Sequence, residues 1–442
     1  MGGELSGRVL WRGEEGYEEA RRAAVWNGRT PPRFPDLLVL AEDEEDVASA
    51  VRLAADEGLK VGVRSGGHSW AGNHLREGGL LLDVSRLDSI EVDPGARTAT
   101  VGPGCQGDRA LAELARHDLF FPAGHCPGVG LGGYLLQGGF GWNGRVHGPA
   151  CMSVEAVDVV TADGELIRAD EERHPDLFWA ARGAGPGFFG AVVRFHLRLY
   201  PKPKHVANGV FLYPIEVLDE VFAWAREIGP RVPREMELMV VIHRDAEGEL
   251  EIAVTGPVLA ESAEQAAEAL ALLETCPVRE RAKAAAPNVE VRMEDLYAAV
   301  HGSYPDGYRY AVDNMWTHAP AGELLPGLRR IAETMPEAPS HMLWMNWGPS
   351  PSRPEMAYSV EDDTYIALYG VWEDPERDEA NSAWATERMR EMEHLSSGIQ
   401  LADENLGLRP ARFVSEENLA RLDRVRERYD PAGLFHPWMG RL

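Results

Sequence analysis

Short apolar runs and amphipathic stretches alternate through about the first 200 residues of the chain. Residues 42–59 open with acidic side chains and then carry apolar ones at helical spacing, which predicts a helix. Residues 59–67, 79–87 and 98–104 are apolar runs that end in turns and predict strands. Residues 108–119 again have the spacing of an amphipathic helix.

Two more strands are predicted over 154–169, because the Asp163-Gly164 pair between them favours a hairpin turn. Another strand is predicted over 191–201, and the PKPKH segment closes it near Lys204. Helices that alternate with strands in this way predict an α/β or α+β domain over 1–205.

The pattern changes beyond this point. Amphipathic spacing predicts helices, and paired apolar runs predict an antiparallel sheet that the helices back. The helices are expected over 215–229, 262–275 and 376–395, and the strands over 236–244, 249–258 and 363–374. In the tail, residues 415–440 predict a capped helix that Asp430-Pro431 ends.

The net charge, the N-terminal stretch and the lengths of the apolar runs argue against several classes of partner and location. The formal net charge of −27 argues against nucleic acid and against an anionic membrane surface. The acidity is expected to serve solubility, and a neutral or cationic substrate is compatible with it. The N-terminal stretch lacks a basic region before an apolar core, and no run approaches the length of a membrane span. A cytoplasmic protein is therefore expected.

The four cysteines are sparse and lack zinc-type spacing, so the sequence predicts neither a disulfide framework nor a metal site.

Two glycine-rich segments carry the candidate chemistry. In Val63–Ser69 a predicted strand runs into Ser-Gly-Gly, whose consecutive backbone N–H groups suit a pyrophosphate. In 122–142 many glycines lie among apolar residues, which indicates backbone packed against a flat ligand. The GVGLGG stretch in it is not a dinucleotide fingerprint, since neither a following helix nor a later acid is expected. Taken alone, each segment is also typical of an ordinary glycine-rich turn that binds no ligand. Cys126 taken alone is also typical of a buried, unreactive thiol.

Together these segments resemble the berberine bridge enzyme-like group of the vanillyl-alcohol-oxidase superfamily of flavoproteins. The resemblance lies in RSGGHS at 64–69 and GHCPGVGLGG at 124–133, and it continues over 177–201 and 418–435. It implies an α+β fold with a PCMH-type FAD-binding domain of two α/β subdomains over 1–205, to which 406–442 returns. A substrate domain over 206–405 would have an antiparallel sheet backed by helices.

The resemblance also implies the cofactor and its attachment. FAD would be held by two covalent bonds, from His68 to the 8α-methyl carbon and from Cys126 to C6 of the ring. An imidazole and a thiolate are suitable nucleophiles for these positions. The implied FAD contacts are Arg64, Ser65, Gly66, Gly67, His68, Ser69, Cys126, Val129, Gly130, Gly132, Gly133, Gly138, Gly139, Gly141 and Val192.

The expected activity is hydride removal from a small organic substrate, an alcohol, sugar or secondary metabolite, with reduction of O₂ to H₂O₂. Val129 implies an oxidase, because in this family a small residue there leaves room for O₂ beside the flavin. Three alternatives stay open: a dehydrogenase with another acceptor, an amine or C–N oxidase, and a flavin-binding protein without turnover. The oligomeric state is not predicted.

The catalytic base is the weakest part of the resemblance. Relatives often carry a tyrosine before the final helix, whereas residues 398–405 read GIQLADEN. By location alone, the candidates are Asp403, Glu404, Tyr308 and Tyr310. A strand over 341–347 would place Met342, Trp344 and Asn346 on one face, either in a packed sheet or in an aromatic pocket over the flavin.

Overall fold

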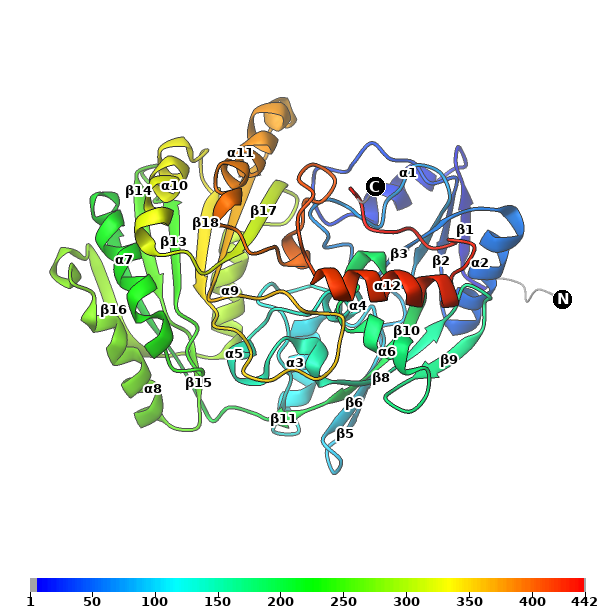
Figure 1. Ribbon diagram of the computed structural model, residues 1–442, viewed down its shortest axis with the longest axis horizontal. Helices are drawn as coiled ribbons and strands as arrows, with labels where there is room; N and C mark the ends of the chain where they lie inside the picture. Colours follow the sequence, from blue (N-terminus) through cyan, green and yellow to red (C-terminus); the bar gives the residue numbers. More distant parts are fainter. Residues whose placement is uncertain (1–5, 441–442) are drawn as a thin grey trace.

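The computed structural model describes residues 6–440, so the first five residues of the N-terminal stretch lie outside it. Three larger sheets and one two-stranded sheet organise the described residues, and the three larger ones set the architecture (Figure 1). Two of them are formed by about the first 200 residues and lie on the right of the view, and one large sheet lies on the left.

The first sheet is mixed and has the strand order β1-β2-β4-β3. Strands β2, β4 and β3 are parallel, and β1 is antiparallel to β2. Strands β2 and β3 lie on either side of β4, and helix α2 forms the crossover between them in the chain, with Asp43 as the cap of its N-terminus. The bounds are β1 Arg8–Trp11, α1 Tyr17–Ala23, β2 Leu37–Leu40, α2 Glu44–Glu57, β3 Val61–Arg64 and β4 Leu80–Asp83.

The second sheet is antiparallel throughout, in the order β5-β6-β10-β8-β9. It shares one apolar core with the first sheet and with helix α12. Its strands are β5 Ile90–Asp93, β6 Thr98–Val101, β8 Val154–Val160, β9 Leu166–Ala169 and β10 Ala191–Arg198. The short β7 Leu119–Phe120 pairs with β11 Tyr200–Pro201, and the helices here are α3 Gly107–Ala115, α4 Leu131–Leu136, α5 Gly144–His147 and α6 Pro175–Ala181.

The third sheet has eight strands in the order β15-β12-β14-β13-β18-β19-β17, with β16 paired to β12. Helices α7, α8, α10 and α11 cover the outer face, whereas α9 lies on the inner side, which turns toward the other two sheets (Figure 1). The strands are β12 His205–Pro214, β13 Met239–Arg244, β14 Leu250–Thr255, β15 Val258–Ala260, β16 Ala284–Glu290, β17 Arg309–Thr317, β18 His341–Asn346 and β19 Thr364–Trp372. The helices are α7 Leu218–Ile228, α8 Ala263–Leu270, α9 Met293–Ser303, α10 Ala321–Thr334 and α11 Asp378–Glu391.

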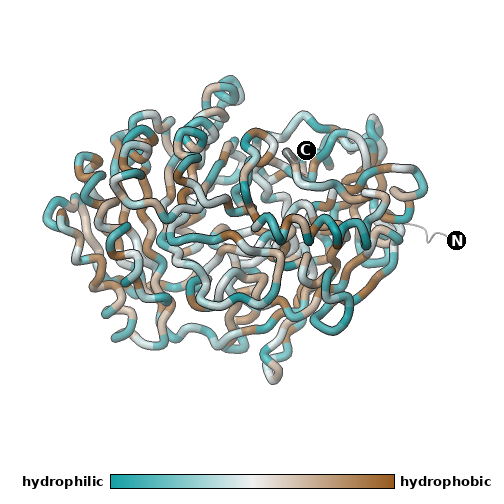
Figure 2. The backbone as a smooth tube through the Cα atoms, in the orientation of Figure 1, coloured by the Kyte–Doolittle hydropathy of each residue, from teal (hydrophilic) through white to brown (hydrophobic). Residues whose placement is uncertain are grey.

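Alternation along β18 separates the two faces of this sheet. Met342 and Trp344 pack into the core between sheet and helices, whereas Met345 belongs to a separate cluster on the inner face. Figure 2 shows the strands mainly brown and the outer helices and loops with much teal, as this layering requires.

The C-terminal segment returns to the first sheet. Helix α12, Glu416–Tyr429, starts at the Ser415 cap, and Arg421 on it pairs with Asp176 of α6. After the helix, Phe435 lies parallel to Val61 of β3, and the Val61 N–H donates to the Leu434 carbonyl. In Figure 1 the red helix accordingly lies across the blue and cyan part of the chain.

The predicted α+β fold class is confirmed. The helix expected over 42–59 is α2, and the hairpins expected over 154–169 and 236–258 are β8-β9 and β13-β14. None of the helices in residues 6–440 combines the length and apolar character that a bilayer crossing requires.

Candidate active site in the cleft between the sheets

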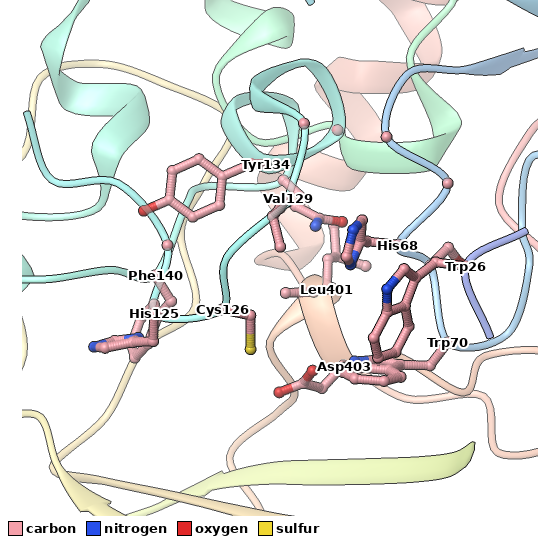
Figure 3. Close-up of a pocket in the computed structure, with 18 of the residues that line it drawn as sticks. Trp26, His68, Trp70, His125, Cys126, Val129, Tyr134, Phe140, Leu401 and Asp403 are labelled. Carbon is pink, nitrogen blue, oxygen red and sulfur yellow. Dashed lines mark hydrogen bonds between the residues drawn. The ribbon is translucent and has the colours of Figure 1, made fainter. Parts of the chain in front are cut away.

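A cavity of about 460 Å³ lies between the two halves of the chain. One wall consists of the loop after β3 and the glycine-rich segment before α4, and the facing wall of strands β13, β18 and β19. Figure 3 shows His68, Cys126, Val129 and Asp403 around this space.

The two glycine-rich segments touch each other at the floor of the cavity. A Cβ on Gly66 would lie 2.6 Å from the Gly130 nitrogen, and one on Gly130 would lie 2.8 Å from the Gly66 nitrogen. Since real Cβ atoms essentially never approach this closely, both positions require glycine. The contact brings the His68 and Cys126 segments onto one surface.

The prediction that no helix follows GVGLGG is wrong, because α4 begins at Leu131. Its glycines have low helix propensity, which hid the helix from the sequence pattern. Contacts from distant segments hold its first turn instead: the Leu131 N–H donates to the Cys105 carbonyl, and the Gly133 N–H donates to the Ser65 hydroxyl at 3.3 Å. The short helix therefore depends on the loop that carries His68.

The His68 ring stacks on Trp26, with ring centroids 4.9 Å apart and an interplanar angle of 20°. Burial lowers the pKa of His68 to about 4, and the Arg64 charge adds to the effect. The imidazole is therefore neutral at neutral pH and keeps a free lone pair on one nitrogen. The stacking fixes the plane of the ring.

The Cys126 thiol points into the same space, toward the side where Asp403 lies (Figure 3). Burial raises the pKa of Cys126 to about 12, and the charge of Asp403 contributes in the same direction. The side chain is thus a thiol at neutral pH, and its use as a nucleophile requires a nearby proton acceptor.

Asp403 is the most strongly bonded acid of the cavity. Its carboxylate accepts hydrogen bonds from Trp70 Nε1 at 2.6 Å, from the Tyr369 hydroxyl at 2.8 Å and from the Tyr365 hydroxyl. Burial raises the pKa of Asp403, and these three hydrogen bonds oppose the shift. A carboxyl group held in this way can accept a proton without moving.

A second hydrogen-bonded pair lies beside this acid. The His341 Nδ1–H donates to the Pro339 carbonyl at 3.0 Å, so the Tyr304 hydroxyl donates to His341 Nε2 at 3.1 Å. Burial lowers the pKa of His341 to about 4, so the ring is neutral. The His341 ring also stacks on Tyr369, 4.7 Å between centroids, which fixes one side of the Asp403 cluster.

Comparison with known proteins places this site in a family. A family model described as an FAD binding domain matches residues 35–170. The FAD-linked oxidoreductase penO of Penicillium crustosum is 33% identical over 96% of this chain and 94% of its own length. The chain belongs to this family of FAD-linked oxidoreductases.

Solved structures agree with this assignment at the level of the fold. The 6-hydroxy-D-nicotine oxidase of Arthrobacter nicotinovorans superposes with a TM-score of 0.86 at 24% identity, covering 98% of this chain and 97% of its own. The Physcomitrella patens BBE-like 1 protein superposes with a TM-score of 0.85 at 19% identity, and the match covers 99% of this chain and 96% of that protein. The fold that the resemblance to the berberine bridge enzyme-like group implies is thereby confirmed.

Most of the FAD contacts expected for this flavoprotein line the cavity. The Arg64 guanidinium, however, is occupied by Asp83, to which its Nη1 donates at 3.0 Å. The cavity-lining members of the expected set are Arg64, Ser65, Gly66, Gly67, His68, Ser69, Cys126, Val129, Gly130, Gly132, Gly133 and Val192.

Three expected glycine contacts lie behind the wall instead. A Cβ on Gly138 would meet Tyr358, one on Gly139 would meet Ala150, and one on Gly141 would meet the Ala123 backbone. Their lack of side chains therefore allows protein packing and not cofactor approach.

Two expected catalytic candidates also lie off the cavity. The Tyr310 hydroxyl donates to the Pro305 carbonyl at 2.6 Å, and Glu404 is bonded to Asn73 and accepts from the Leu406 N–H. Burial raises the pKa of Glu404 to about 7, but its carboxyl group faces the protein interior. Tyr308 does not line the cavity either.

FAD fits the polar groups that remain on the wall. Gln400 Nε2 and His74 Nε2 are buried, line the cavity and have no hydrogen-bond partner among the described residues. Buried polar atoms normally have partners, so a bound polar ligand is expected there. The flat isoalloxazine and the pyrophosphate both offer such partners.

Sequence reasoning missed the residues around Asp403. Tyr365 and Tyr369 share one face of β19, and their spacing of four in an apolar strand was the available signal. Trp70 directly follows the RSGGHS motif. Of the two alternatives for the Met342 and Trp344 face, the packed sheet is confirmed and the aromatic pocket is wrong, because both side chains pack under the helices. His341, Leu343 and Met345 line the cavity instead.

Proposed function

We propose that this chain is an FAD-dependent oxidase that attaches its flavin through both His68 and Cys126 and oxidises a small organic molecule with O₂. The observation that carries the proposal is that a neutral imidazole and a thiol, distant in sequence, line one wall of one cavity. FAD, when bound, supplies the hydride acceptor.

The chain's own groups would orient substrate and move protons. His68 offers an unprotonated nitrogen, and its stacking on Trp26 limits its rotation. Asp403, held by Trp70 and two tyrosines, would accept the proton that the substrate loses. This assigns to Asp403 the role that a tyrosine has in many relatives.

Denatured protein should carry the mass of FAD on the wild type and on each of His68→Ala and Cys126→Ala. The double variant should carry none, because no other nucleophile is proposed to bond the ring. Intact mass spectrometry and flavin fluorescence in a denaturing gel measure this directly. Wild-type protein without added mass would refute covalent attachment, and a single variant that loses all flavin would reduce the two bonds to one.

Oxygen access is proposed to depend on Val129, which lines the cavity. Among proteins of similar fold, wild-type Phl p 4.0202 is a glucose dehydrogenase, and an isoleucine-to-valine variant of Phl p 4 is a glucose oxidase. The family resemblance assigns the gating position to Val129, so its valine supports the oxidase over the dehydrogenase.

Val129→Leu should slow reoxidation of the reduced flavin by O₂ roughly 10- to 100-fold, because an added methylene in a packed site costs about 1–3 kcal/mol. Stopped-flow mixing of dithionite-reduced protein with oxygenated buffer measures the rate. Val129→Ala is the matched control and should stay as fast as wild type. Slow reoxidation of the wild type itself would favour the dehydrogenase alternative.

A further inference from the structure

The charged side chains of the cavity are divided unevenly between its walls. Among the described residues, the arginines on the wall are Arg64 and Arg76, both on the side of the first sheet. Arg64 pairs with Asp83, and Arg76 donates to the Asn73 and Pro437 carbonyls. They offer no free cation to a substrate on the opposite side.

The side of the cavity opposite the first sheet, called here the substrate side, carries acidic side chains but no lysine or arginine among its described residues. Its acids are Asp403 and Asp306, and Asp306 accepts from Trp26 Nε1 at 3.0 Å. His341 is neutral and its two nitrogens are bonded to Pro339 and Tyr304. An anionic substrate would therefore meet like charge without compensation.

Aromatic rings lie beside Asp403. Trp70 lies 6.0 Å from Tyr304 and 5.9 Å from Tyr369, and Tyr304 lies 5.1 Å from Tyr369, between ring centroids. Tyr365 donates to Asp403 from a further side. Trp70, Tyr365 and Tyr369 direct their N–H and O–H groups at the carboxylate, and their rings together form an aromatic wall beside it that suits an organic cation.

The β13 and β18 part of this wall is apolar, and the polar side chains beside it, Asn208 and Thr255, are hydrogen-bonded to each other at 2.9 Å. Met239 pairs with Met345 and Val241 pairs with Leu343 across β13 and β18, and all four line the cavity. This strip has no side-chain hydrogen-bonding groups for the hydroxyls of a sugar, and buried hydroxyls without partners are costly. It suits a hydrocarbon or aromatic body.

We propose that the substrate is a hydrophobic amine, bound as the ammonium ion at Asp403 with its apolar body on the strip of Met239, Val241, Leu343 and Met345. This inference rests on the proposed flavin-dependent oxidation and narrows its substrate class. An alcohol, a sugar and a carboxylate are the classes that it excludes.

The reaction balances with the groups already named. Asp403 takes one proton from the ammonium nitrogen and leaves a neutral amine. The α C–H bond breaks, its hydrogen and two electrons leave as hydride to the oxidised flavin, and the nitrogen lone pair forms the C=N bond. Water then hydrolyses the iminium to a carbonyl compound and ammonia, or an amine where the substrate nitrogen carries a substituent, and O₂ takes up the two electrons with two protons as H₂O₂.

Three probes with one skeleton test the proposal: 1-(naphthalen-2-yl)ethylamine, 1-(naphthalen-2-yl)ethanol and 2-(naphthalen-2-yl)propionic acid. Binding to the oxidised holoenzyme is followed by the flavin absorbance under anaerobic conditions. The amine should bind at least about tenfold more tightly than the alcohol, since a buried charge pair easily exceeds that factor, and the acid should bind weakest. Only the amine should bleach the flavin.

Substitutions at Met345 supply matched variants. Met345→Lys should weaken amine binding about tenfold more than Met345→Gln does, and it should strengthen binding of the acid, because only lysine adds a positive charge. Asp403→Asn should remove the preference for amine over alcohol.

Faster bleaching by the alcohol, tighter binding of the acid, or no response to the amine at millimolar concentration would overturn the proposal. These results are separable from the proposed function. Covalent attachment of the flavin is measured by intact mass, and oxygen reactivity is measured by the rate of reoxidation after dithionite reduction. Neither measurement involves a substrate.

Discussion

Asp403→Asn should lower the rate of substrate-driven flavin reduction by about 10²- to 10⁴-fold, the usual contribution of a positioned acid–base group. Asparagine keeps the shape of the side chain, and its single oxygen can still accept from Tyr365 and Tyr369, but its N–H₂ group replaces the oxygen that accepts from Trp70. It has no carboxylate to take the proton of the substrate. The measurement is anaerobic stopped-flow reduction with the same bound substrate in both proteins.

The design separates chemistry from folding and from cofactor loss. The flavin-to-protein ratio of Asp403→Asn is measured by absorbance, and oxygen reoxidation after dithionite should stay at the wild-type rate. Asp158→Asn is a suitable control, because Asp158 is also a buried carboxylate that accepts from a neighbour, His196, but it lies on β8 outside the cavity. Its reduction rate should match wild type.

Two results would remove Asp403 from the proposed role. One is an Asp403→Asn rate within about threefold of wild type at full flavin content, a difference of less than about 1 kcal/mol in the barrier. The other is an equal loss in Asp158→Asn, which would indicate a general effect of removing a buried carboxylate.

The sequence predicted local structure where one segment suffices to determine it. The α2 helix has its own acidic start and apolar stripe, and the β8-β9 hairpin has its own Asp-Gly turn. Helix α4 could not be predicted in this way, since its glycines form a helix only because Cys105 and Ser65 from other segments bond its first turn.

The same distinction holds for the site. His68 and Cys126 stand in local motifs, so the amino-acid sequence alone was enough to single out their segments. The environment of Asp403 could not be predicted in this way, because Trp70, Tyr365 and Asp403 meet only when three distant segments fold together. Burial then decides the protonation states, and burial is a property of the whole fold.

The segment that carries Asp403 is anchored to β17 by neighbouring side chains of the strand. The Asn314 side-chain N–H₂ donates to the Gln400 and Asp403 carbonyls at 3.0 and 2.8 Å, and its oxygen accepts from the Gln400 N–H at 2.8 Å. Beside it, Arg409 Nε donates to both carboxylate oxygens of Asp313 at 3.0 Å. Arg409 and Asp313 are only 3% and 1% exposed in their side chains.

Arg409→Met should therefore lower the free energy of unfolding by about 3–5 kcal/mol, because it leaves the Asp313 carboxylate buried without its cation. The double variant Asp313→Leu/Arg409→Met should recover most of that loss, since apolar side chains of similar volume replace a buried ion pair at little net cost. Guanidinium denaturation followed by circular dichroism and by flavin fluorescence gives both values. A loss below about 1 kcal/mol, or a double variant less stable than Arg409→Met, would show that the pair does not anchor the Asp403 segment.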